Sequence, residues 1–245
     1  MSDPIDALAD ERKRNLEQVA RDPAIKALSL EWLNESAKRR YSYNFTWLGR
    51  PIIQYPQDMV ALQEIVWTTR PDLIVETGVA HGGSLILSAS LLHLLGGDGH
   101  VLGIDIEIRP HNRAAIEAHP LGQRIILIEG SSTSEEVVAQ VRARAAGKRT
   151  LVILDSNHTR DHVLAELDLY SPMVPCGSYL IVMDTSIDDM PAGSFPDRPW
   201  GKGNSPRTAV RDFLGRNRRF AVDTELENKL LITVAPGGYL RCIED

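Results

Sequence analysis

Cysteine is scarce in this sequence, which has only Cys176 and Cys242 among 245 residues. Two thiols are too few for a four-cysteine zinc site or for the disulfide framework of a small secreted domain. The first residues, up to about residue 18, are polar and charged and do not have the apolar core of a signal peptide. We therefore expect reduced thiols and a cytoplasmic location.

The sequence also lacks a long apolar run and an excess of positive charge. The most apolar stretch, between Gly78 and Leu95, is interrupted by Gly, His and Ser residues, so we expect no membrane span. Acidic residues number 33 against 27 lysines and arginines, giving a formal net charge of -6. This balance argues against non-specific binding to nucleic acid or to an anionic membrane. A small molecule is the partner that we expect.

The N-terminal part of the chain is predicted to form an appendage to a larger domain. Residues 5–40 are predicted to be helical, with acidic residues early and basic residues late, as the helix dipole favours. The aromatic stretch 41–55 has no clear period, and it is either a packing segment or an apolar wall or lid for a ligand. We expect a helical arm over 1–55 and an α/β domain over 56–245, beginning with a helix at 56–70.

From residue 71 onward, short β-branched runs alternate with helical stretches. The predicted strands are 73–77, 101–106, 125–130, 150–156, 178–184, 220–224 and 229–236. The predicted helices are 84–95, 111–118, 134–145, 160–170 and 206–215. Such alternation indicates βαβ units, and hence a doubly wound, mostly parallel seven-stranded sheet with helices on both faces. The last two strands are close enough to form a hairpin, which makes one of them antiparallel.

In sheets of this kind, ligands bind at the carboxyl ends of the strands, so the residues there are candidate site residues. The first strand runs into a glycine-rich loop, in which Gly78 permits a tight turn and Gly82 permits close approach to a ligand. Its spacing is not that of a dinucleotide-binding loop, and a purely structural turn is the alternative. Asp105 ends the second strand, where a carboxylate can accept from ribose hydroxyls. Ser131 and Ser132 follow the third strand and could border an adenine.

The fourth and fifth strands end in carboxylates. Asp155 and Asp184 would form a hard-oxygen site suited to Mg²⁺ or Ca²⁺, unless each only caps the turn that follows. His158 is a candidate general base, because an imidazole can accept a proton near neutral pH. His162 is expected on the helix surface or in the core.

The long segment 185–205 is predicted to be a loop that gates the substrate, since structureless loops of that length are uncommon in compact domains and often functional. Asp188 and Asp189 either reach a metal or lie in solvated turns. The candidates for an apolar or sugar-stacking wall are Trp47, Tyr55, Phe195 and Trp200.

Several of these segments together resemble the cephalosporin hydroxylase and rhamnosyl O-methyltransferase family. The segments that carry the resemblance are YNFTWLGRPIIQYPQD, ETGVAHGGS, GID, EGSS, LDSNHTRDHVLAELDLYSPMV, GSYLIVMDT and PGGYLR. The resemblance spans most of residues 40–241 and implies an S-adenosylmethionine-dependent O-methyltransferase on a Rossmann-like sheet. One departure stands at the fifth strand, where Met183 and Ser186 replace the Glu and Asn of the family pattern. The missing Glu removes a possible metal ligand, and Ser186 is a poorer ligand than Asn.

The resemblance also assigns roles to residues. The methionine part of the cofactor would be held by Glu76, Gly78, Gly82 and Ser84. The ribose would be held by Asp105, and the adenine would lie beside Ser131 and Ser132. Asp155 would contact the cofactor, bind Mg²⁺ and take part in catalysis, and Asp184 would be the second metal ligand. His158 takes the position of a basic lysine in related enzymes.

The implied reaction is in-line methyl transfer to a hydroxyl of a sugar, glycoside or natural product, as in natural-product biosynthesis. The alternatives are a nicotinamide-dependent oxidoreductase, a true hydroxylase, and a non-catalytic subunit that binds the cofactor for a partner enzyme. A non-haem iron hydroxylase would need two histidines and a carboxylate, and no paired histidines stand at the strand ends. The arm and its aromatic stretch suggest a homo-oligomer.

Overall fold

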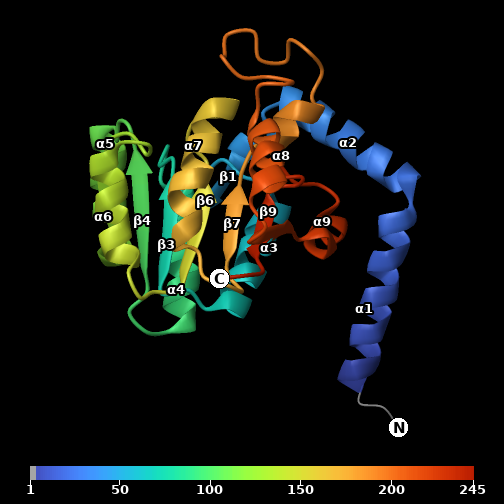
Figure 1. The fold of residues 1–245 in the computed structure, drawn as a ribbon, viewed down its shortest axis with the longest axis horizontal. Helices are drawn as coiled ribbons and strands as arrows, with labels where there is room; N and C mark the ends of the chain where they lie inside the picture. Colours follow the sequence, from blue (N-terminus) through green and yellow to red (C-terminus); the bar gives the residue numbers. More distant parts are fainter. Residues whose placement is uncertain (1–3) are drawn as a thin grey trace.

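The structure is a computed structural model that describes residues 4–245, and its N-terminal part is a bent helical arm. Two helices form the arm, α1 (Pro4–Arg21) and α2 (Pro23–Lys38), where the sequence predicts one. The bend lies at Asp22, whose side chain accepts hydrogen bonds from the first amides of α2, and a proline opens that helix. Figure 1 shows α1 and α2 running along one side of the molecule, with much of α1 extending beyond the body.

The aromatic stretch after the arm forms a short hairpin. A 3₁₀ turn at Tyr41–Asn44 leads into β1 (Phe45–Trp47) and β2 (Arg50–Ile52), which pair antiparallel. The hairpin packs on α4 (Gly83–Leu95), and Trp47 Nε1 donates to Ser90 Oγ of that helix at 3.0 Å. Trp47 is therefore a packing residue.

A seven-stranded sheet forms the body of the molecule. Its strands are β3 (Leu73–Thr77), β4 (His100–Asp105), β5 (Ile125–Glu129), β6 (Thr150–Leu154), β7 (Tyr179–Val182), β8 (Phe220–Val222) and β9 (Tyr239–Cys242). They lie in the order β5-β4-β3-β6-β7-β9-β8. All neighbours are parallel except those of β9, which runs antiparallel to both β7 and β8. The order reverses between β3 and β6, and this places the switch point of the sheet at the carboxyl ends of these two strands.

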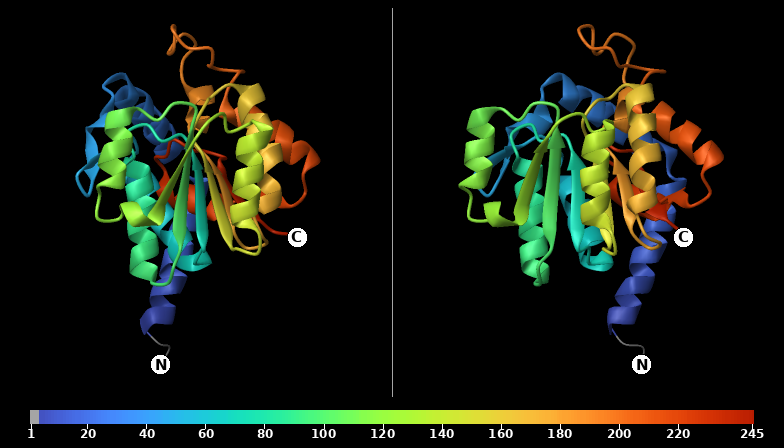
Figure 2. Two further views of the ribbon diagram at one scale, coloured as in Figure 1. Left: turned by 90° about the vertical axis from the view of Figure 1, so that its left-hand side faces the viewer. Right: turned by 60° about the vertical axis from the view of Figure 1, so that its left-hand side comes forward.

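Helices cover both faces of the sheet, as the doubly wound prediction requires (Figures 1 and 2). The helices are α3 (Pro56–Thr69), α4, α5 (Pro110–Glu117), α6 (Glu135–Ala145), α7 (Arg160–Tyr170), α8 (Pro206–Arg216) and α9 (Thr224–Leu230), with 3₁₀ turns at Gly122–Arg124, Ser171–Met173 and Thr185–Asp189. Ile74 packs with α3 and α4, while its neighbours Leu73 and Val75 pack with α6, α7 and α8. This alternation follows from the two-residue period of a strand. Within residues 4–245, no helix has the length and apolarity needed to cross a membrane.

The predicted strand 229–236 is wrong. Asp223 caps a helix by accepting from Leu226 N, so α9 extends to Leu230, and a loop follows before β9. The antiparallel strand is nevertheless present, as β9. The division of the chain at residue 55 stays a prediction.

A buried carboxylate ties the loop before β9 to α3. Asp58 accepts from Thr233 Oγ1, from Val234 N at 3.1 Å and from Tyr239 OH at 2.7 Å. It is 2% exposed, and burial raises its pKa to about 6 despite these hydrogen bonds. The contact joins segments that are far apart in the chain.

Candidate active site

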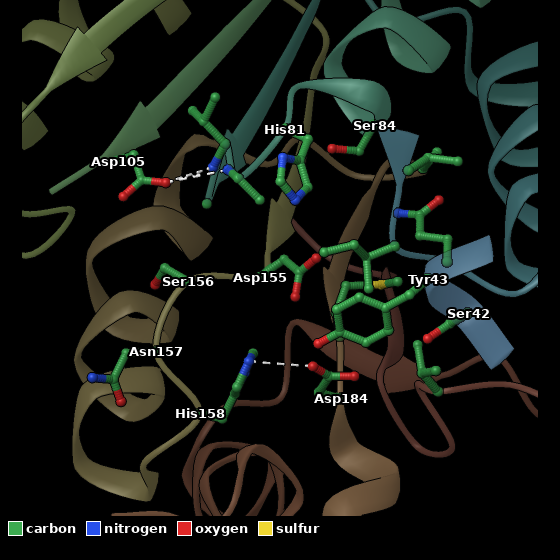
Figure 3. A pocket seen from close by; sticks show the side chains of 18 of the residues that line it. Ser42, Tyr43, His81, Ser84, Asp105, Asp155, Ser156, Asn157, His158 and Asp184 are labelled. Carbon is green, nitrogen blue, oxygen red and sulfur yellow. Dashed lines mark hydrogen bonds and ion pairs between the residues drawn. The ribbon is translucent and has the colours of Figure 1, made fainter. Parts of the chain in front are cut away.

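A cavity of about 1120 Å³ opens at the carboxyl edge of the sheet. Its walls come from the loop after β3, the ends of β4, β5, β6 and β7, the hairpin segment 51–55, and the long loop 185–205. All of the predicted cofactor, metal and catalytic residues except Glu76 line this cavity, and Figure 3 shows the side chains of several of them facing a common space.

The glycines of the loop after β3 are required by contacts within the protein. Gly78 has φ +94°, and a Cβ there would lie 2.1 Å from the carbonyl oxygen of Asp155. A Cβ on Gly82, where φ is +81°, would lie 2.4 Å from Ile116 Cδ1. The sequence predicts that Gly82 allows close approach of a ligand, and in the structure the residue that approaches it closely is Ile116 of α5. Both glycines line the cavity.

Glu76 lies behind the cavity wall and is 1% exposed. Ser84, which lines the cavity, donates its hydroxyl to Glu76 Oε1, while Oε2 is buried without a partner among the described residues. Burial raises the pKa of this carboxyl to about 7, although the Ser84 hydrogen bond opposes the rise. Glu76 is thus a buried acceptor beside the glycine-rich loop.

Asp105 lines the cavity at the end of β4 and also stabilises the neighbouring loop. Its Oδ2 accepts from Val79 N at 2.8 Å. The next residue, Ile106, is 71% exposed although it lines the cavity. A carboxylate beside an exposed aliphatic side chain suits a ribose with an attached base.

Asp155, His158 and Asp184 form a cluster whose ligand atoms all lie within 4.8 Å of one another. His158 Nε2 is 3.2 Å from Asp184 Oδ2, and Figure 3 shows Asp155 nearby, above this pair. Asp184 has a left-handed backbone with φ +56°, which is costly for a non-glycine residue and is often found at functional sites. Two carboxylates and an imidazole form a donor set that fits a divalent cation.

The two carboxylates repel each other. Burial and, next, the charge of Asp184 raise the pKa of Asp155 well above its usual range, and Glu76 adds to the effect. A cation between the carboxylates would offset this repulsion and favour the ionised form of both.

The long loop 185–205 contributes aromatic side chains to the cavity. Its outer part projects from the body at the top of Figure 1. Trp200 contacts His158 edge-to-face, with ring centroids 4.8 Å apart, and Phe195 also lines the cavity. Tyr55 lines it from the hairpin side although it is only 3% exposed. Three of the four predicted wall residues are therefore at the site, and Trp47 is the exception.

The two carboxylates of the loop, Asp188 and Asp189, form contacts that the sequence does not predict. Asp188 accepts from Gly203 N at 2.8 Å and from Ser205 Oγ at 3.1 Å, and Asp189 forms an ion pair with Arg207. Both carboxylates attach the loop to its own far end and to α8.

Sequence reasoning missed several residues of the cavity wall. These are Arg40, Ser42, Tyr43, His81, Arg109, Asn157 and His162. Figure 3 shows Tyr43 extending from the hairpin side toward Asp155 and Asp184. The aromatic content of the stretch 41–55 was a usable signal for this residue, whereas the arginines stand at no strand end. Ser131 and Ser132 line the cavity as expected.

Comparison with known proteins gives a consistent set of relatives. The family described as "Rhamnosyl O-methyltransferase/CmcI" matches residues 39–243. A rhamnosyl O-methyltransferase of Mycobacterium tuberculosis is 31% identical over 202 residues, which cover 80% of this chain and 77% of the relative. One of Mycobacterium leprae is 31% identical over 198 residues, which cover 80% of this chain and 82% of the relative. Among solved structures, an apo form of CmcI matches with TM-score 0.58 at 21% identity, covering 83% of this chain and 78% of that one. A CmcI structure with Mg and SAM matches with TM-score 0.57 at 20% identity, covering 82% and 77%.

Proposed function

Because the chain belongs to the rhamnosyl O-methyltransferase/CmcI family, we propose that it transfers a methyl group from S-adenosylmethionine to a hydroxyl oxygen of a small molecule, with help from Mg²⁺. The acceptor class is a sugar, a glycoside or another hydroxylated natural product. The observation that carries the proposal is the single cavity that joins Asp105, the glycine-rich loop and the Asp155–His158–Asp184 cluster.

The cavity wall divides into a cofactor half and an acceptor half. Asp105 would accept hydrogen bonds from the ribose hydroxyls, and Ser131 and Ser132 would border the adenine. Ser84 and the loop glycines would face the methionine part, with Glu76 as the buried acceptor behind them. The aromatic side chains and the metal cluster then bound the remaining space, where the acceptor would lie.

The sulfonium of the cofactor supplies an electrophilic methyl group, and Mg²⁺ supplies Lewis acidity toward the acceptor hydroxyl. Asp155 and Asp184 would hold the metal through their carboxylate oxygens. The walls must bring the acceptor oxygen to within about 3–3.5 Å of the methyl carbon and in line with its bond to sulfur. His158 would then accept the hydroxyl proton.

The geometry suits His158 for proton transfer. Its Nε2 faces Asp184 Oδ2, an acceptor, so the proton of the neutral ring belongs on Nε2 and Nδ1 is left to act as the base. Trp200 packs against the ring and limits its rotation. Asp184 thus orients the base while its other oxygen is available to the metal.

The first test is calorimetric titration of the metal-stripped protein with S-adenosylhomocysteine, with and without Mg²⁺. We expect micromolar binding, and turnover of a hydroxylated acceptor by the isolated chain would exclude a non-catalytic role. Absence of binding under both conditions would overturn the proposed cofactor.

A second test assigns the role of His158. General-base catalysis is typically worth about 10²–10⁴-fold, so His158→Ala should lower turnover by that factor and leave S-adenosylhomocysteine binding unchanged. The matched control is His93→Ala, because His93 is exposed near the end of α4. Loss of Mg²⁺ binding in His158→Ala would instead make His158 a metal ligand.

The helical arm further supports a homo-oligomer as part of this proposal. Leu28 of α2 is 63% exposed and Leu8 of α1 is 56% exposed, on helices that extend from the body. The molar mass of the full chain by light scattering tests this, and a monomer at all concentrations would refute it.

A further inference from the structure

A polar cluster connects the residues that follow β5 and β6 to two residues of α7. His162, in the first turns of α7, lines the cavity with its side chain 24% exposed, whereas the sequence predicts a position on the helix surface or in the core. Glu166 lies one turn later on the same helix and is 0% exposed. Ser132 and Ser156, the other members, also line the cavity.

The surroundings of His162 determine which of its nitrogens carries the proton. Nε2 lies 3.1 Å from Ser132 Oγ, 3.3 Å from Ser156 Oγ and 3.4 Å from Glu166 Oε1. Ser156 Oγ donates to Glu166 Oε1 at 2.8 Å, so this hydroxyl has only lone pairs left for the imidazole. Glu166 Oε1 already accepts the Ser156 hydroxyl, so it too offers only lone pairs to the imidazole, and the proton belongs on Nε2. In the neutral ring, Nδ1 is then a hydrogen-bond acceptor.

The hydrogen bonds and ion pairs of the buried Glu166 side chain all go to residues of the cavity wall. Among the described residues, its side chain contacts only Ser156 and His162 by hydrogen bond or ion pair, and Oε2 is buried without a partner. Burying a carboxylate costs several kcal/mol in general. Both of its partners line the cavity, so the effect of this charge is exerted on the cavity wall.

The cluster lies where a base attached to the ribose would be. Asp105 is the ribose acceptor at the end of β4, and Ser132 lies beyond the end of the adjacent strand β5. Ile106, the residue after Asp105, offers an exposed aliphatic face to the same cavity. The position of Ser132 is itself fixed, because Tyr170 OH donates to its carbonyl oxygen at 2.8 Å.

We infer that His162 selects the base of the cofactor by accepting a hydrogen bond from the 6-amino group of adenine, and that Glu166 is a positioning residue that holds the imidazole in the required tautomer. This inference rests on the proposed function. A 6-oxo purine has no donor at that position, so its carbonyl oxygen would face the lone pair of Nδ1. The cluster therefore favours adenosyl over inosyl ligands.

The test compares two probes, S-adenosylhomocysteine and S-inosylhomocysteine, by calorimetric titration. A neutral hydrogen bond is worth about 0.5–1.5 kcal/mol, which is about 2- to 13-fold in affinity, so we expect the wild type to prefer the adenosyl probe by about that factor. His162→Ala should remove most of that preference. His93→Ala serves as the matched control and should retain the full preference.

Glu166→Gln separates positioning from packing, because glutamine keeps the shape of the side chain. Its amide can donate to Nε2 and move the ring proton to Nδ1, so the preference should fall or reverse while adenosyl binding persists. If both variants weaken the two probes equally and the ratio stays at its wild-type value, the cluster has only a structural role and the inference is overturned. Failure of the wild type to bind either probe would instead overturn the proposed function.

Discussion

Glu76 offers a quantitative test of the electrostatics of the site through Glu76→Gln. The folded chain holds this carboxyl at a pKa of about 7, against an ordinary 4.5. At about 1.4 kcal/mol for each tenfold change in the ionisation constant, this difference corresponds to about 3 kcal/mol. Because the residue is 1% exposed, solvent does not screen the effect.

The sign follows from linkage. A carboxyl whose folded pKa is raised binds its proton more tightly when folded, so the free energy of unfolding falls as pH rises from about 4.5 to about 7. Glutamine cannot ionise, and it can still accept the Ser84 hydroxyl. The difference in the free energy of unfolding between the variant and wild type should therefore shift by about 3 kcal/mol in favour of the variant between pH 4.5 and pH 8. This shift does not depend on how stable the variant is at pH 4.5.

The assay is urea unfolding of both proteins at the two pH values, followed by far-ultraviolet circular dichroism. Glu17→Gln is the control, because Glu17 is an exposed carboxyl on α1 and its change should be nearly independent of pH. An equal stability difference at pH 4.5 and pH 8 for Glu76→Gln would refute the raised pKa. If the variant also binds S-adenosylhomocysteine as wild type does, cofactor binding does not need the charge of Glu76.

Three further predictions concern backbone, loop and metal. Gly78→Ala should destabilise the protein by more than about 2 kcal/mol, because backbone strain and a steric clash add. Gly147→Ala, also at positive φ but in open space, should cost about 1 kcal/mol. Equal losses of stability for the two variants in urea unfolding would contradict this. Asp188→Ala should lower the free energy of unfolding by about 1–3 kcal/mol and speed proteolysis within 190–204. Asp197→Ala is the control and should do neither, because Asp197 is an exposed carboxylate of the same loop. An unchanged cleavage rate in Asp188→Ala would refute the anchoring role of Asp188. In Asp184→Asn, added Mg²⁺ or EDTA should no longer alter S-adenosylhomocysteine binding, and a persistent metal effect would exclude Asp184 as a ligand.

The body of the fold could be predicted because its signals are local. Each strand from β3 to β7 is a short apolar run rich in β-branched residues and bounded by turn residues, and a helical stretch follows each of the first four. The error at 229–236 has a physical origin, because the apolar run LLITV also has the composition of a strand. There the cap at Asp223 and the contacts of Asp58 determine the structure, and the second of these depends on tertiary folding.

The site could be predicted as far as it depends on strand ends. Topology alone brings Asp105, Asp155 and Asp184 to one edge of the sheet. His162 could not be assigned, because only the packing of α7 shows that its ring lies between two serines that follow different strands. The anchoring role of Asp188 likewise depends on where the loop returns to the body.

The buried carboxylate of Asp58 has a consequence for the order in which the molecule assembles. The strand β9 that contributes Tyr239 is inserted between β7 and β8, and the loop that Asp58 binds supplies Val234 to the cavity wall. During synthesis, α3 and β3 through β7 leave the ribosome well before this strand, and until then Asp58 has none of these three partners. A nascent chain shorter than about Tyr239 thus has an open sheet gap and an incomplete pocket, so ligand binding and the final closure of the sheet should occur together, late in synthesis.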